Sequence, residues 1–138
     1  QLYDLMAWIA IAIAIPMTFF SDWVIYSLYG EQFSDAGGVL MIHIWSAVFV
    51  FLGVASSRWF IAESLQKYSF YRTLAGAILN VCLNWILIPK YGIYGAAIAT
   101  LISQIVASYL FNILNKKSRI TFILHTKSLL LPFRRVRW

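Results

Sequence analysis

Residues 80–103 read NVCLNWILIPKYGIYGAAIATLIS, two apolar segments joined by a short turn of sequence PKY. The first segment ends an apolar run over residues 73–88, and the second belongs to a run over residues 92–114. An α-helix rises about 1.5 Å per residue, so roughly 20 residues cross about 30 Å of hydrocarbon. With their flanking residues, both runs are therefore expected to span a membrane.

The composition of the whole chain favours the same environment. Hydrophobic residues make up 62% of the 138 residues and charged residues only 12%, whereas a soluble domain carries about 25% charged residues. A small soluble fold must cover its surface with polar groups, and this chain has few of them. The six Trp and eight Tyr are typical of side chains at the membrane–water interface.

Two more apolar runs lie upstream, from Leu5 to about Leu28 and from Ala36 to about Ile61, and Pro16 invites a kink in the first. Backbone groups in hydrocarbon must pair internally, which leaves only helices and closed barrels. Barrel strands are about ten residues long with alternating polarity, unlike these runs. The sequence therefore predicts an all-α, polytopic membrane protein. Its transmembrane region, residues 1–114, is expected to contain four helices: 5–28, 36–61, 68–88 and 92–114.

The distribution of Lys and Arg predicts the orientation. Arg58, Lys67 and Arg72 lie around the connector between the second and third predicted helices, and seven basic residues lie in the tail, residues 115–138. Only Lys90 occupies the alternate connectors. Basic residues concentrate on the cytoplasmic side, so the tail is expected to be cytoplasmic, and an even number of crossings puts the N-terminus there too. This distribution favours a membrane flank over a nucleic-acid site as the cause of the net charge of +6.

The chain contains no motif that predicts enzyme chemistry. It has no HExxH sequence, no Gly-rich phosphate loop, and no suitably placed set of Ser, His and acid. Cys82 is the only cysteine, which excludes an intrachain disulfide and a zinc site of several cysteines. We therefore predict no enzyme, cofactor or metal, although integral glycosyltransferases and ligases share this kind of composition.

His43 is a polar residue inside the second predicted span. Ser46, Gly53 and Ser57 follow it at offsets of three, ten and fourteen residues, which keeps them on one helix stripe. An ionisable group at this depth indicates a functional role. A neutral His that bonds a neighbouring helix is the equal alternative.

Asn80 and Asn84 lie one turn apart on the third predicted span, and Gly76 and Arg72 lie one and two turns before Asn80 on its face. Carboxamides facing lipid would leave donors unpaired, so this face is expected to meet protein or a water-filled cavity. The two hypotheses are hydrogen bonding between helices and contact with a substrate.

Small residues recur every four positions on the fourth predicted span, at Gly95, Ala99, Ser103 and Ala107. Such a stripe lets helix backbones approach closely, so we predict a packing face. Gln104 lies beside the stripe and could face a substrate.

The sequence resembles bacterial polysaccharide flippases of the multidrug, oligosaccharidyl-lipid and polysaccharide exporter superfamily. The likeness rests on the stretch 80–103, with an Asn-rich helix, an LIP ending, a YGI turn and a GAAIAT helix. Residues 28–45, LYGEQFSDAGGVLMIHIW, are similar to the aromatic–Gly turn that precedes another helix of that family.

This resemblance implies a protein of about twelve helices in two halves, of which the chain would supply the ninth to twelfth. Such proteins move undecaprenyl-diphosphate-linked sugar repeat units, for O-antigen or other surface polysaccharide, across the bacterial inner membrane. Its expected partners are the lipid-linked oligosaccharide and membrane lipids, with a polysaccharide polymerase and a chain-length regulator as further candidates. No nucleic acid is expected.

The resemblance also suggests roles for polar residues. Arg58 and Arg72 would meet the diphosphate at the cytoplasmic mouth, since Arg can bond phosphate oxygens with both arms of its fork; both are otherwise topology markers. Asn80 and Asn84 would line the path. Alternative functions are a drug–cation antiporter, a flippase for a peptidoglycan or teichoic-acid precursor, and a non-transporting scaffold or polymerase subunit.

The predicted orientation can be tested by cysteine labelling in intact cells. A cysteine introduced in the tail, for example at Ser128, should react with an impermeant reagent only from the cytoplasmic side. Labelling from the periplasm would contradict the orientation.

Overall fold

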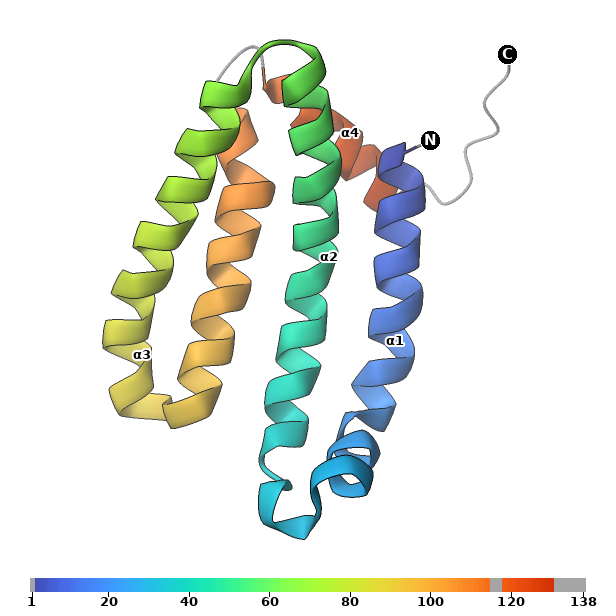
Figure 1. The fold of residues 1–138 in the computed structure, drawn as a ribbon, viewed down its shortest axis with the longest axis vertical. Helices are drawn as coiled ribbons and strands as arrows, with labels where there is room; N and C mark the ends of the chain where they lie inside the picture. The colour runs from blue at the N-terminus through green and yellow to red at the C-terminus, as the bar shows by residue number, and fades with distance from the viewer. Residues whose placement is uncertain (1, 115–117, 131–138) are drawn as a thin grey trace.

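The computed structural model describes residues 2–114 and 118–130, and all regular structure within them is helical (Figure 1). The helices in chain order are α1 (Leu2–Tyr29), η1 (Glu31–Phe33), α2 (Ala36–Ala62), α3 (Gln66–Ser108), η2 (Leu110–Ile113) and α4 (Arg119–Leu130). Among the described residues, three stretches are long and apolar enough to cross a membrane: Leu2–Tyr29, Ala36–Ala62 and Gln66–Ile113. The polytopic all-α class is therefore confirmed.

Helix α3 folds back on itself at Gly92, where φ is 56° and ψ is −132°. Figure 1 shows its two arms side by side, and we name residues 66–91 the first arm and residues 93–108 the second arm. A positive φ suits glycine, because a side chain would clash with the backbone there. The predicted turn after the third run is present, although the helix is assigned continuously across it.

The expected end of the fourth helix, near Leu114, agrees with the end of the candidate span at Ile113, but the last turn of that span is not α-helical. The second arm ends at Ser108, and the single turn η2 follows. The side chain of Asn112 donates to the carbonyl oxygen of Ser108 at 2.9 Å, the oxygen that a continued helix would offer to the Asn112 backbone. This competition explains the early end of the helix.

The connector after α2 is slightly shorter than the sequence predicts. The predicted helices 36–61 and 68–88 leave residues 62–67 between them, whereas only residues 63–65 separate α2 from α3, and Ser64 turns the chain with a φ of 58°. Helix α3 begins at Gln66, where polar residues form a regular helical turn. Arg72 therefore lies inside a helix, about 9 Å along its axis from the first residue.

Helices α1 and α2 pack through small side chains. Ala10 and Ala14 of α1 form a buried cluster with Val48 of α2. Gly37 of α2 lies so close to Asp22 that an added Cβ would overlap the carboxylate. Close approach of backbones favours association where lipid supplies no hydrophobic driving force. Many of the large aliphatic and aromatic side chains of α1 are exposed instead, including Phe19 and Trp23.

Helix α4 packs its polar side against the bundle and contacts α1 and η2. Its buried residues are Thr121, His125 and Ser128. Ser128 is 2% exposed, so a cysteine there would be shielded from reagents on both sides. The exposed Lys127 is the better position for the labelling experiment.

The close contact across the α3 turn can be tested at Gly95. A Cβ there would overlap the carbonyl of Leu87, which is backbone and cannot rotate away. We expect Gly95→Ala to destabilise the protein by about 1–3 kcal/mol, as overpacking does, and to lower its melting temperature in detergent. Val81→Ile, one carbon larger on an exposed part of the same helix, should leave that temperature unchanged. Equal melting temperatures for both variants would contradict the contact.

Candidate functional site

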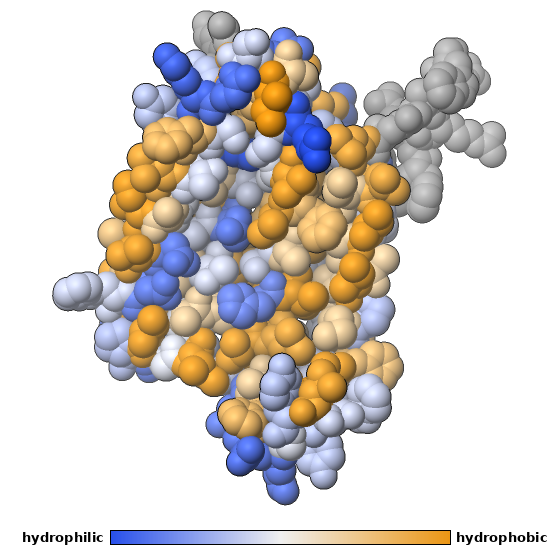
Figure 2. Space-filling model, in the orientation of Figure 1, coloured by the Kyte–Doolittle hydropathy of each residue, from blue (hydrophilic) through white to orange (hydrophobic). Residues whose placement is uncertain are grey.

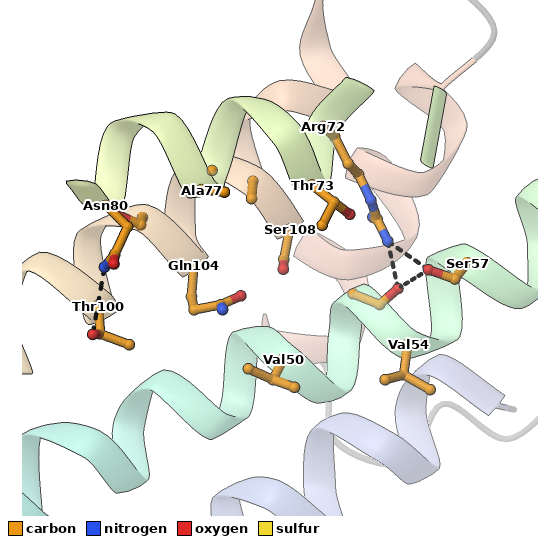
Figure 3. Close-up of a pocket in the computed structure, with 14 residues that line it drawn as sticks. Val50, Val54, Ser57, Arg72, Thr73, Ala77, Asn80, Thr100, Gln104 and Ser108 are labelled. Carbon is orange, nitrogen blue, oxygen red and sulfur yellow. Dashed lines mark hydrogen bonds between the residues drawn. The ribbon is translucent and has the colours of Figure 1, made fainter. Parts of the chain in front are cut away.

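A cleft of about 390 Å³ lies between α2 and the two arms of α3. Figure 2 shows hydrophilic side chains along a hollow in this face of the molecule, with hydrophobic side chains on both sides. The polar residues that line the cleft are Ser57, Arg72, Thr73, Asn80, Thr100, Ser103, Gln104 and Ser108. All three helical segments therefore contribute polar groups to one space (Figure 3).

Arg72 is buried at one end of this cleft, with 4% of its surface exposed. Its Nη2 donates to the carbonyl oxygen of Gly53 at 2.7 Å and to Ser57 Oγ at 2.8 Å (Figure 3). Its Cζ lies 5.2 Å from the centre of the Phe60 ring. None of these three partners carries a negative charge, so the guanidinium is held by dipoles and a ring face.

The guanidinium of Arg72 keeps unused bonding capacity. Its Nη1 is buried and makes no hydrogen bond within the described part of the chain. Arg72 is also the one charged residue among the described residues that line the cleft. A buried charge is costly unless it is paired. The cleft is therefore suited to an anion.

Two asparagines extend the polar groups away from Arg72. Asn84 Nδ2 donates to Asn80 Oδ1 at 3.0 Å, and Asn80 Nδ2 lies 3.5 Å from Thr100 Oγ1 on the other arm. A distance of 3.5 Å is long for a strong hydrogen bond. Asn84 Oδ1 is buried with no hydrogen-bond partner among the described residues. Asn80 lines the cleft, and both predicted roles, bonding between helices and substrate contact, are compatible with its geometry. Asn84 is not among the lining residues of this cleft, and its substrate contact stays a prediction.

The other predicted site residues divide into two groups. Gln104 lines the cleft, whereas His43 and Arg58 are exposed and are not among its lining residues. A substrate role for His43 or Arg58 stays a prediction. The members of the predicted packing stripe are all buried: Gly95, Ala99, Ser103 and Ala107. A Cβ on Gly76 of the first arm would crowd Ala107 of the second.

Sequence reasoning missed three hydroxyl residues of the cleft: Thr73, Thr100 and Ser108. Each is a small polar residue next to or inside an apolar run, and such residues commonly bond their own backbone instead. Thr100 Oγ1 does donate to the carbonyl oxygen of Ala96 at 2.9 Å. The useful signal was its four-residue spacing from Gln104 and Ser108, which puts all three near one helix face.

A second polar cluster, around His125 of α4, lies near Arg72. His125 is fully buried, and its Nε2 lies 2.7 Å from Ser56 Oγ of α2. The rings of Tyr3 and Tyr109 lie 5.2 and 6.1 Å from its ring. Burial lowers the pKa of His125 to about 4, and the positive charge of Arg72 adds to the effect. His125 is therefore neutral at pH 7.

Comparison with known proteins identifies the family. Residues 1–133 match the family model described as lipid II flippase MurJ. The chain belongs to this family. This match confirms the predicted membership of a flippase family. No group of His, Cys, Asp and Glu within the described residues could hold a metal ion.

Two curated relatives of this chain are archaeal. An uncharacterized membrane protein of Methanocaldococcus jannaschii is 38% identical over 73 residues, 49% of this chain and 17% of the relative. The probable low-salt glycan biosynthesis flippase Agl15 of Haloferax volcanii is 33% identical over 84 residues, 61% of this chain and 18% of the relative. The chain spans less than a fifth of the length of either relative. No solved structure matches it significantly.

The buried His125 predicts a pH dependence of the docking of α4. Its pKa is about 6.5 in an unfolded chain and about 4 here, so the unfolded state binds more protons between these values. The contribution of His125 to stability is therefore fully present above pH 6.5. It declines as the pH falls towards 4, by a total on the order of 3 kcal/mol. Proteolysis of α4 should become faster over this range.

His125→Gln supplies the control, because the carboxamide can still bond Ser56 but does not titrate. The variant should show no acceleration between pH 6.5 and pH 4. An equal acceleration in both proteins would mean that other groups cause it.

Proposed function

We propose that the protein containing this chain moves a polyprenyl-diphosphate-linked glycan across the bacterial inner membrane. The observation that carries the proposal is the buried Arg72, a cation with no anionic partner among the described residues, on the wall of a polar cleft. The diphosphate would bond its free Nη1 and exchange with Gly53 and Ser57 for Nη2. A planar guanidinium suits this exchange, because its fork matches two phosphate oxygens.

The polar groups beyond Arg72 fit the sugar part of such a substrate. Asn84 lies twelve residues after Arg72 on the first arm, about 18 Å along the helix axis. Amide groups of Asn80, Asn84 and Gln104 can donate to and accept from sugar hydroxyls. In this arrangement the diphosphate lies towards one end of the cleft and the glycan extends along it.

The proposed topology gives α1 and α2 one crossing each and α3 two crossings, one for each arm. Arg58 and Lys67 lie at the end of the bundle that Arg72 approaches, which we assign to the cytoplasm by the excess of basic residues. Residues 115–138 would then be a cytoplasmic tail. The rest of the proposed twelve helices would come from outside this chain and complete the cavity.

The identity of the glycan leaves two candidates. A repeat unit for O-antigen or another surface polysaccharide is the substrate implied by the stretch 80–103. A peptidoglycan precursor is the second candidate, and the family description favours it. The Haloferax relative, named as a glycan biosynthesis flippase, supports the shared chemistry of both. Rescue of strains that lack one or the other flippase would distinguish them.

Two further alternatives receive less support from the cleft. A drug–cation antiporter needs a negative site, whereas Arg72 gives the described lining of this cleft a positive charge. A scaffold or polymerase subunit needs no polar cleft of this kind. Accumulation of substrate in the cytoplasmic leaflet of a deletion strain would separate a transporter from a scaffold.

We expect Arg72→Gln to reduce transport in the full-length protein. A hydrogen bond to a charged group contributes roughly 1.5–3 kcal/mol, so the loss should be about 10- to 150-fold if the bond forms in the rate-limiting state. Lys should rescue partly, since it keeps the charge but lacks the fork. Surface glycan would be measured in a flippase-deleted strain at limiting expression of the variant.

Ser57→Ala is the matched structural control, because it removes one bond of Arg72 and keeps the cation. Its transport should stay within a few-fold of wild type if the charge matters more than the contact between helices. Lys67→Gln, at an exposed basic residue nearby, controls for topology. Wild-type glycan levels with Arg72→Gln would reject the diphosphate contact.

A further inference from the structure

Helix α4 has its polar and apolar sides in an unexpected arrangement. Its fully buried residues are polar: Thr121, His125 and Ser128. Its exposed residues are three large aliphatics and two cations: Arg119, Ile120, Ile123, Lys127 and Leu130. At about 100° per residue, the exposed group covers roughly 100° of the helix surface and the buried group lies on the opposite side.

The buried hydroxyl groups of α4 have hydrogen-bond partners within the described residues, whereas Nδ1 of His125 has none there. Thr121 Oγ1 donates to the carbonyl oxygen of Ser118 at 2.6 Å, and Ser128 Oγ donates to that of Leu124 at 2.9 Å. Nε2 of His125 lies within hydrogen-bond distance of Ser56 on α2. The inner side of α4 is therefore fixed by bonds to itself and to the bundle, which leaves its aliphatic side outward.

The exposed side of α4 does not suit bulk water. Ile120, Ile123 and Leu130 are 49%, 44% and 71% exposed. Arg119 and Lys127 lie eight residues apart on the same side, where their stems can follow the aliphatic side chains and carry their charges outward. An apolar stripe with cations beside it is the composition of a helix that lies in a membrane interface.

The position of α4 supports the same environment. Figure 1 shows α4 at the end of the bundle where α2 passes into α3, and the exposed basic residues Arg58 and Lys67 lie at this end. Positive charge gathered at one level of a membrane protein is complementary to anionic headgroups.

We propose that the exposed side of α4 binds the anionic lipids of the adjoining leaflet. Ile120, Ile123 and Leu130 insert among the upper acyl chains, while Arg119 and Lys127 contact lipid phosphates. Contact with lipid holds α4 over the end of the bundle near Arg72. This surface is distinct from the cleft, and lipid binding there does not depend on which substrate the protein moves.

The test uses the full-length protein with its native cysteines replaced, Cys82 included, and a fluorophore on a cysteine at position 123. The protein is reconstituted in phosphatidylcholine vesicles that contain a minor fraction of phosphatidylglycerol. Quenching is compared between nitroxide-labelled phosphatidylglycerol and nitroxide-labelled phosphatidylcholine. We expect both lipids to quench, and phosphatidylglycerol to quench at lower mole fraction.

The charge variants decide the headgroup contact. Arg119→Gln and Lys127→Gln should each reduce the preference for phosphatidylglycerol about fivefold, the effect of roughly one unit charge near an anionic surface. Lys90→Gln, at the turn of α3 near the opposite end of the bundle, should leave the preference unchanged. Absence of quenching by either lipid would mean that protein covers α4, and equal quenching would mean no anionic preference; each result overturns the proposal.

Discussion

The guanidinium of Arg72 bonds the first arm of α3 to α2, and much of the site depends on that bond. Arg72 donates to the carbonyl oxygen of Gly53 on α2, and Ser57 one turn later supplies the second acceptor. Its remaining donor stays unused in the described structure. A buried cation held only by neutral groups is a costly arrangement, and binding an anion would relieve that cost.

Small and hydroxyl-bearing residues make the rest of the arrangement possible. Alanine and glycine bring α1 against α2 and one arm of α3 against the other. Hydroxyl groups satisfy themselves on carbonyl oxygens of the preceding helical turn, as in Ser103 and Thr100, so they can line a cleft or a helix interface without bound water. The same device lets α4 bury a polar side and expose an apolar one, which couples the helix to both the bundle and the lipid.

How much could be predicted depended on the range of the interaction involved. Residues 80–103 predicted the apolar arms and the turn between them, since proline, glycine and apolar runs act locally. Arg72 was recognised as important, but its role as a diphosphate contact or as a topology marker stayed open, because a basic residue near the end of a predicted span suits both. The bond from Arg72 to Gly53 crosses nineteen positions of sequence, and no local pattern specifies it.

The sequence by itself determined that the chain lies in a membrane, that it is helical and that it reverses direction at Gly92. These follow from composition, run length and backbone chemistry, which each residue carries wherever it lies. Only the tertiary structure decided which polar residues share a cleft and which side of α4 is buried. In the sequence, His43 and Arg72 are both ionisable residues within predicted spans, and nothing local distinguishes their roles. The packing of α2 against α3 leaves the first exposed and buries the second, because the burial of a polar group depends on which helices surround it.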